Sequence, residues 1–255
     1  MKTKEDLITD LEKNVFNSSS VIKLESYAGT GKTTTLEEIF KYYPSKRILY
    51  LVFNASMKRE AERRLSNQKN VKVSTLHGLA YPFYKNNYPN VELQNDITAM
   101  DIKEQFKIED IKLACKILND YKSFLASEHT LENLENDNIL NELREIKELE
   151  EHEQNEDPYK EMYNPIDQRN NLEKEEDLLI TYKFSKYVLR ILNLQKEGEL
   201  GFTHDTYLKL FQLSNPCLTN KYDIIAIDEA QDITMSTVKI FNDQQCMKII
   251  VGDRY

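Results

Sequence analysis

The sequence predicts an α/β fold in which a parallel, doubly wound sheet is interrupted by a helical insertion. Short apolar segments alternate with helical segments near both ends of the chain, which is typical of a parallel sheet. Between Pro89 and Gly198 the strand signals disappear, and apolar residues recur at helical intervals. We therefore expect residues 1–89 and 201–255 to build the sheet and residues 90–200 to form the insertion.

The first predicted strand, Val21–Leu24, runs into a glycine-rich turn and then into a helix. The turn follows the phosphate-loop pattern of Gly, four residues and Gly-Lys-Thr, except that Ser26 replaces the first glycine. Glycines let backbone N–H groups surround phosphate oxygens, and a helix that starts at Lys32 adds its positive dipole end. We predict that a nucleotide binds to Ala28, Gly29, Thr30, Gly31, Lys32, Thr33 and Thr34.

The following segment predicts two further strands with a helix between them. Pro44 closes the preceding helix, and the apolar run Arg47–Phe53 is typical of a strand. Met57–Leu65 has helical composition with charges on one face, and Val71–Ser74 is a short strand.

The insertion is predicted to be helical, with an acidic middle. We expect part of Leu131–Asp157 to be an exposed helix or a disordered strap, and Leu172–Lys196 to be a long helix. Before the acidic part, apolar residues repeat at helical spacing at Ile108, Ile111, Cys115, Leu118, Tyr121 and Leu125.

Two apolar strands are expected near the end of the chain, and each is followed by acidic residues. Ile224–Ile227 leads into Asp228 and Glu229, and Lys248–Val251 leads into Gly252-Asp253. Ligands meet open parallel sheets at the carboxyl ends of the strands. We therefore expect Asp228 to bind Mg²⁺ together with the Thr33 hydroxyl, and Glu229 to polarise an attacking water. The expected cofactors are ATP and Mg²⁺, with Lys32 neutralising the β- and γ-phosphates.

Charge is unevenly distributed along the 255 residues, whose net charge is -9. Residues 41–85 hold ten Lys/Arg and two Asp/Glu, whereas residues 131–177 hold five and seventeen. The basic run from Lys58 to Lys72 favours contact with phosphates, although solvated helix faces also produce such runs.

No segment approaches the roughly 18 apolar residues of a membrane helix, so we expect no membrane contact and a cytoplasmic or nuclear location. The three cysteines, Cys115, Cys217 and Cys246, lie in apolar segments without metal-ligand spacing. We expect them to pack in the core.

Several segments resemble motifs of the UvrD-like superfamily 1 DNA helicases, and most of all those of F-box DNA helicases. The most specific is Asp228–Asp232, which is similar to motif II. Ala28–Thr34 resembles motif I and Leu51–Ser56 resembles motif Ia. Ser74–Gly78 is similar to motif Ib, and Val251–Asp253 is similar to the start of motif III. Gly201–Leu210 is similar to the segment that precedes motif II in F-box relatives.

The resemblance implies a RecA-like P-loop NTPase domain, called 1A, interrupted by a helical 1B domain, in a protein that serves DNA repair. Single-stranded DNA would cross both domains and contact Phe53, Asn54, Thr75 and His77. Gln231 would couple the γ-phosphate to DNA and so complete a catalytic set with Lys32, Asp228 and Glu229. The alternatives are that Phe53 is a core residue and that His77 merely starts a helix.

Three departures from the family pattern affect what can be carried over. No glutamine precedes Gln68, so the usual adenine contact is absent or replaced, and Ala55 stands where relatives have a motif Ia lysine. The sequence stops at Tyr255, before the glutamine of motif III and before any 2A domain. We expect a truncated motor half that needs a C-terminal 2A/2B half in cis or in trans and has weak or no ATPase activity alone.

Two functions follow from these expectations. The first is the N-terminal motor half of an ATP-dependent single-stranded-DNA translocase or helicase. The alternative is a nucleotide- or DNA-binding module that regulates a partner helicase without translocating. A small-molecule P-loop kinase does not account for the segment Asp228–Asp232.

Overall fold

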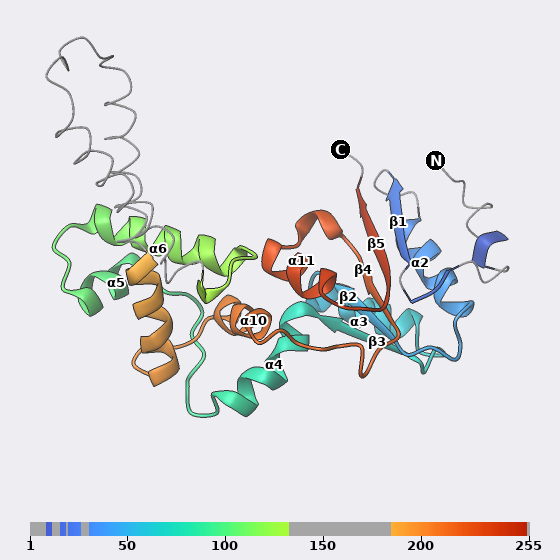
Figure 1. Cartoon of the computed structure of the whole chain (residues 1–255), viewed down its shortest axis with the longest axis horizontal. Coiled ribbons are helices and arrows are strands. Elements are labelled where there is room, and N and C mark those ends of the chain that lie inside the picture. Colours follow the sequence, from blue (N-terminus) through green and yellow to red (C-terminus); the bar gives the residue numbers. More distant parts are fainter. Residues whose placement is uncertain (1–8, 12–15, 19, 27–30, 133–184, 254–255) are drawn as a thin grey trace, which may run out of the picture. The chain divides into compact units, whose positions relative to one another are not determined.

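The computed structural model describes residues 9–11, 16–18, 20–26, 31–132 and 185–253, without the side chains of Glu25, Ser26 and Lys32. The chain divides into two compact units (Figure 1). The first comprises residues 1–89 and 204–255, and the second comprises residues 90–203.

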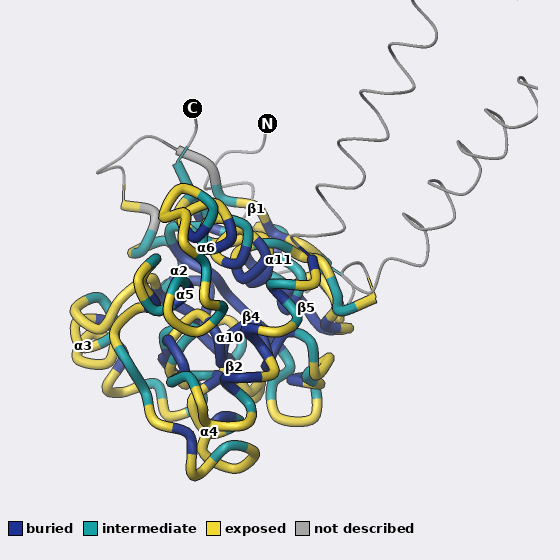
Figure 2. Tube along the Cα trace, turned by 90° about the vertical axis from the view of Figure 1, so that its left-hand side faces the viewer, coloured by how far each residue is buried: buried dark blue, intermediate teal, exposed yellow. Residues whose placement is uncertain are grey.

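The first unit is built on a five-stranded sheet in which every paired strand is parallel. The strand order is β1-β5-β4-β2-β3. All residues of β2 and β4 are buried, so both faces of the sheet are covered (Figure 2). The predicted α/β fold with a parallel sheet is confirmed. The strands are β1 (Val21–Ser26), β2 (Ile48–Val52), β3 (Val71–Thr75), β4 (Ile224–Ile227) and β5 (Met247–Asp253).

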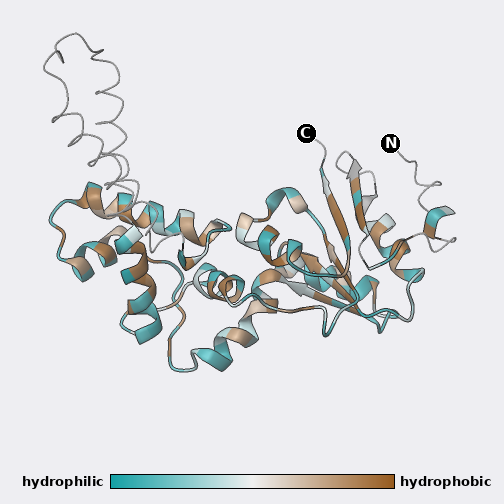
Figure 3. Ribbon diagram, in the orientation of Figure 1, coloured by the Kyte–Doolittle hydropathy of each residue, from teal (hydrophilic) through white to brown (hydrophobic). Residues whose placement is uncertain are grey.

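Helices follow the strands and supply the rest of this unit's core. One hydrophobic cluster joins alternate residues of the strands to apolar residues of α2 and α3, and Figure 3 shows brown, hydrophobic stretches within the strands. The helices are α2 (Lys32–Lys41), α3 (Ala55–Arg64), α4 (Leu76–Asn87), α10 (His204–Leu213), the short 3₁₀ helix η2 (Ala230–Asp232) and α11 (Met235–Asn242).

Helix α4 as a whole was not predicted from the sequence. Pro82 lies inside it, and proline normally disfavours a helix interior because it lacks an N–H donor. Packing overrides this preference: Tyr84 is buried and stacks on Tyr207 of α10, with 5.4 Å between ring centroids. The hydroxyl of Thr75 caps the helix by accepting a hydrogen bond from the N–H of Gly78 at 3.0 Å.

The described part of the second unit is mainly helical, as predicted, with one isolated β-bridge between Leu93 and Phe202. It contains α5 (Ala99–Phe106), α6 (Ile111–Ala126) and a helix over residues 185–197. Thr98 and Asp101 form a capping box at the start of α5. Residues 133–184, which include nearly all of the acidic middle and the start of the predicted long helix, lie outside the described residues.

The buried stripe of α6 differs from the predicted one. Ala114 and Ile117 are buried, whereas Ile111 and Cys115 are exposed. In this part of α6 the buried positions lie one residue earlier than predicted, and at Tyr121 the predicted and observed buried positions agree. The expected core packing of the cysteines is therefore wrong for Cys115. It is also wrong for the exposed Cys217 and correct for the buried Cys246.

Candidate nucleotide-binding site

The start of α2 and the end of β4, which were predicted to share one Mg²⁺ ion, meet at the carboxyl edge of the sheet. Helix α2 begins after Gly31, whose φ of 83° is a left-handed conformation that favours glycine. In the first turn of α2, the Thr33 hydroxyl donates a hydrogen bond to Oδ2 of Asp228 at 3.0 Å. Asp228 directly follows β4. The contact joins residues that are 195 positions apart in the sequence.

The carboxylate of Asp228 is buried and is held by neutral donors. Only 1% of the residue is exposed. Tyr50 of β2 donates its hydroxyl hydrogen to Asp228 Oδ2 at 2.7 Å, and the N–H of Glu229 donates to Oδ1 at 3.0 Å. Burial, reinforced by the Asp228 charge, raises the pKa of Tyr50, so the phenol remains a donor. Tyr50 was not predicted as a site residue, because an aromatic residue within an apolar strand is typical of the core.

Gln231 connects the ends of two neighbouring strands. Its Nε2 donates to Oε2 of Glu229 at 2.7 Å, and its Oε1 accepts from the backbone N–H of Asp253 at 3.1 Å. A Cβ at Gly252 would lie 3.1 Å from the same Oε1, so a side chain there would crowd the amide. Glu229 itself has a left-handed backbone with φ of 52°, which is uncommon outside glycine. Gln231 therefore fixes the orientation of the Glu229 carboxylate relative to the end of β5.

The phosphate loop is described only in part. Ala28, Gly29 and Thr30 lie outside the described residues, as does the side chain of Lys32. Thr34 is exposed, and its hydroxyl accepts a hydrogen bond from Arg64 Nη2 of α3 at 3.2 Å.

Arg64 links α3 to α2 through a second contact as well. Its Nε lies 3.0 Å from Oε1 of Glu37. Burial raises the pKa of Glu37, and the Arg64 charge opposes that rise. Arg64 was not predicted as a site residue, because nothing in the local sequence of α3 indicates which partner its side chain reaches.

The four residues predicted to contact DNA lie at the ends of β2 and β3, where Val52 and Thr75 are paired in register. Phe53 is 50% exposed, so the alternative that it is a core residue is wrong. Asn54 caps α3 by accepting from the N–H of Met57 at 2.9 Å, as Thr75 caps α4. His77 lies in the first turn of α4, with Nε2 3.1 Å from Oδ1 of Asp205.

The chemistry of the site suits a hard divalent cation bound to a polyphosphate. The Thr33 hydroxyl and the carboxylates of Asp228 and Glu229 are oxygen ligands of the kind that Mg²⁺ prefers. Few protein ligands are needed, because phosphate oxygens and water normally complete the octahedral shell of Mg²⁺.

Residues 7–254 match the model of the UvrD/REP helicase N-terminal domain. The chain belongs to the UvrD/REP helicase family. The match spans both described units, and it confirms the resemblance that the motifs predicted. Members of this helicase family generally use a nucleotide and a metal ion.

Two relatives are similar over most of the chain. The F-box DNA helicase protein 1 of Schizosaccharomyces pombe is 29% identical over 255 residues, which cover 94% of this chain and 26% of that protein. The F-box DNA helicase 1 of Gallus gallus is 31% identical over 246 residues, which cover 91% of this chain and 21% of that protein. The chain therefore spans about a quarter of the length of these relatives.

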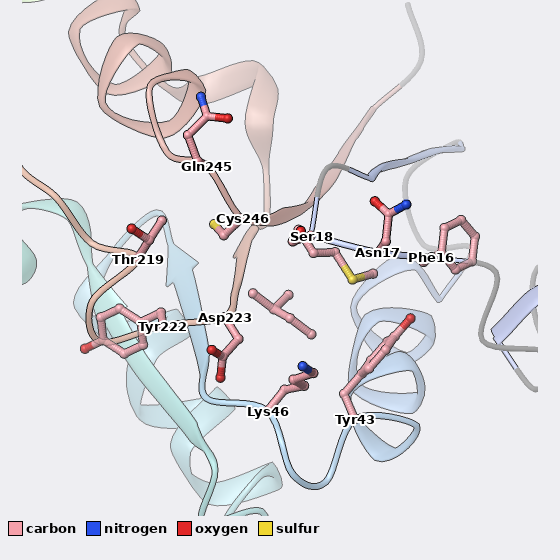
Figure 4. A pocket seen from close by; sticks show the side chains of 12 residues that line it. Phe16, Asn17, Ser18, Tyr43, Lys46, Thr219, Tyr222, Asp223, Gln245 and Cys246 are labelled. Atoms are coloured by element: carbon pink, nitrogen blue, oxygen red, sulfur yellow. The ribbon is translucent and has the colours of Figure 1, made fainter.

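A separate hollow of about 210 Å³ lies at the opposite edge of the sheet, where β4 and β5 begin (Figure 4). Tyr43, Lys46, Asp223 and Cys246 contribute to its lining. Asp223 forms an ion pair with Arg47, with 2.9 Å between Oδ1 and Nη2. Parallel sheets bind ligands at the carboxyl ends of their strands, whereas this hollow lies at the amino ends and is separate from the nucleotide site.

Among the described residues, no helix has the length and apolar character needed to cross a membrane.

Proposed function

We propose that this UvrD/REP family chain is the part of an ATP-dependent single-stranded-DNA translocase or helicase that binds ATP–Mg²⁺ and contacts DNA. The observation that carries the proposal is the hydrogen bond between Thr33 and Asp228, which brings the start of α2 and the end of β4 to one point. Both relatives are named as DNA helicases.

Each residue of the site has a defined task in this proposal. The backbone of Ala28–Gly31 surrounds the phosphates and Lys32 neutralises them, while Thr34 extends the contact at the start of α2. Thr33 and Asp228 hold Mg²⁺, which would screen the phosphate charge when bound. Glu229 orients and polarises the attacking water, and the hydrogen bond from Gln231 keeps its carboxylate in position.

The DNA contacts use the ends of β2 and β3. The exposed ring of Phe53 stacks on a base, and the imidazole of His77 offers a second aromatic face. Capping uses only the acceptor side of Asn54 and Thr75, so the Asn54 amide and the Thr75 hydroxyl can still donate hydrogen bonds to phosphates. The two neighbouring strands thus present both stacking and phosphate-binding groups.

We further propose that domain 1A comprises residues 1–89 and 201–255, that residues 90–200 form domain 1B, and that a 2A/2B half completes the motor. Translocation requires ATP to close a cleft between two RecA-like domains. The chain alone should therefore bind nucleotide and hydrolyse it slowly at most.

The first test measures the binding of a fluorescent methylanthraniloyl-ATP to the chain with and without Mg²⁺. Lys32→Ala should abolish binding, because it removes the charge that neutralises the phosphates. Glu229→Gln should retain binding. A chain that binds no nucleotide, or that binds it equally well after Lys32→Ala, contradicts the proposal.

The second test measures ATPase activity of a longer form that carries a 2A half. Single-stranded DNA should stimulate hydrolysis. Glu229→Gln should lower the rate by about 10²–10⁴-fold, the usual contribution of general base catalysis. The absence of DNA stimulation in the longer form would argue against a motor.

A further inference from the structure

Tyr50 lies within the apolar core of the first unit but ends at the candidate metal site. It is 1% exposed in the middle of β2, and its ring packs edge-on against Phe40 of α2 with 5.4 Å between centroids. Its hydroxyl is 2.7 Å from Asp228 Oδ2, the same oxygen that accepts from Thr33. The phenol therefore joins three elements, α2, β2 and the end of β4.

The register of the strands explains how the ring reaches this oxygen. Tyr50 is paired with Ala226, so both side chains point to the same face of the sheet, and Asp228 follows two positions later on that face. The small side chain of Ala226 leaves room along the strand. The Tyr50 ring can lean over it toward the carboxylate.

Thr33 and Tyr50 have different parts in this arrangement. The Thr33 hydroxyl donates its only hydrogen to Asp228, which leaves its oxygen lone pairs for a cation. Tyr50 is fixed by its packing and has no such ligand role, because its oxygen is buried against the carboxylate. Its hydrogen bond limits the rotation of the Asp228 carboxylate and so keeps Oδ2 directed at Thr33.

We propose that Tyr50 is a positioning residue for the nucleotide-bound magnesium ion, acting through Asp228 and Thr33. This inference rests on the proposed ATP–Mg²⁺ function of the site and adds a residue that no part of the phosphate loop or acidic pair includes. Partners that orient metal-binding groups typically contribute about 10–100-fold to metal affinity. The expected contribution of the Tyr50 hydroxyl is at the lower end, because Thr33 and the Glu229 N–H still hold the carboxylate.

The test is Tyr50→Phe in the full chain, which removes the hydroxyl and keeps the ring against Phe40. Methylanthraniloyl-ATP fluorescence is titrated with MgCl₂, and the Mg²⁺ concentration at half-maximal change should rise about 10-fold. Nucleotide affinity in EDTA should change less than about 2-fold, which a general loss of structure would not allow.

Tyr43→Phe is the matched control. Tyr43 also has a buried hydroxyl in the first unit, but among the described residues this hydroxyl has no hydrogen-bond partner and it lies at the other edge of the sheet. The Mg²⁺ midpoint of this variant should equal that of the unaltered chain. If the folded Tyr50→Phe variant has an unchanged or lower Mg²⁺ midpoint, the positioning role of Tyr50 is wrong, while the proposed function of the site still stands. If the unaltered chain does not bind nucleotide, both the proposed function and this inference are wrong.

If Tyr50→Phe does not fold, 3-fluorotyrosine placed at position 50 retains the hydroxyl and reports on it by ¹⁹F NMR. Its resonance should shift on addition of Mg²⁺ to the nucleotide-bound chain and saturate together with the fluorescence change. A resonance that does not respond to Mg²⁺ overturns the proposal.

Discussion

Strand β4 carries an aspartate immediately before it and another immediately after it, and the two have opposite surroundings. Asp223 at the amino edge has a side chain that is 33% exposed and is paired with the Arg47 guanidinium. Asp228 at the carboxyl edge is 1% exposed, and its hydrogen bonds come from two hydroxyls and a backbone N–H.

The difference lies in how each charge is balanced. Arg47 donates to both oxygens of Asp223 and holds the pKa of that carboxyl at about 2, so the pair is complete within the protein. Within the described part of the chain, the hydrogen-bond donors to Asp228 orient its carboxylate, and none of these donors carries a full positive charge. A buried carboxylate held by neutral donors is suited to a cation that arrives with a ligand. The first aspartate therefore serves the fold, and the second is available for function.

The largest effect is expected from substitutions of the two aspartates. Asp228→Asn should weaken Mg²⁺-dependent nucleotide binding by about 100-fold, because the charge is lost while an acceptor for Tyr50 and Thr33 remains. Asp223→Asn should leave the same binding within about 2-fold. Calorimetric titration of both variants with ATP and Mg²⁺ measures this. Equal losses of nucleotide affinity in the two variants would contradict the different roles of the two aspartates.

The second prediction compares exposed aromatic residues at the two edges. Phe53→Ala should lower affinity for a single-stranded oligonucleotide by about 10-fold, since stacking on one base contributes about 1–3 kcal/mol. Tyr42→Ala is the control, because Tyr42 is 37% exposed and lies before β2 rather than after it. Fluorescence anisotropy with labelled oligo-dT measures both affinities. If DNA affinity depended on Tyr42 and not on Phe53, the DNA contact would lie at the amino edge of the sheet, which would contradict the prediction.

The third prediction compares two buried phenols by stability. Tyr50→Phe should lower the free energy of unfolding by about 1–2 kcal/mol, because it removes a hydrogen bond to a charged group. Tyr43→Phe should be neutral or slightly stabilising, because within the described part of the chain its hydroxyl has no partner. Urea unfolding followed by circular dichroism gives both values. A larger loss for Tyr43→Phe would contradict this assignment of partners.

The smallest expected effect concerns acid stability at the amino edge. The pKa of Asp223 is lowered to about 2 in the folded chain. Its contribution to the free energy of unfolding is therefore fully present when the pH is above the ordinary aspartate pKa of 3.8. The contribution is lost as the pH falls from about 4 to about 2. Melting temperatures of the unaltered chain and Asp223→Asn should therefore converge over this range. The effect should be smaller than that of Tyr50→Phe, since the pair is partly exposed to solvent.

The parallel sheet could be predicted because its strands are short apolar runs, and the carboxyl-edge residues could be predicted because their positions follow from the strand ends. Thr33 and Asp228 were expected to act on one ion, and the structure brings them into hydrogen-bond contact. The contacts that hold them could not be predicted. Tyr50 and Arg64 act through partners that are distant in sequence, and local sequence patterns do not show which distant residues become neighbours.

Helix α4 and the inward face of α6 show a different limit. Pro82 opposes a helix locally, and only the packing against α10 explains why α4 continues through it. In α6, a buried Ala114 and an exposed Cys115 reverse what side-chain hydrophobicity alone suggests. Both cases are decided by neighbouring elements, whose positions local periodicity does not specify.

The position of β5 also has a consequence for synthesis of the chain. Strand β1 lies at the edge of the sheet, and β5 is its neighbour, while β5 pairs on its other side with β4. On the ribosome, β2 and β3 can pair early, but β1 must wait until residues 247–253 have emerged. Strand β1, which leads into the phosphate loop, is thus among the first segments to be synthesised and the last strand to pair with the sheet. A nascent chain that ends before Met247 should be unable to hold that loop in place.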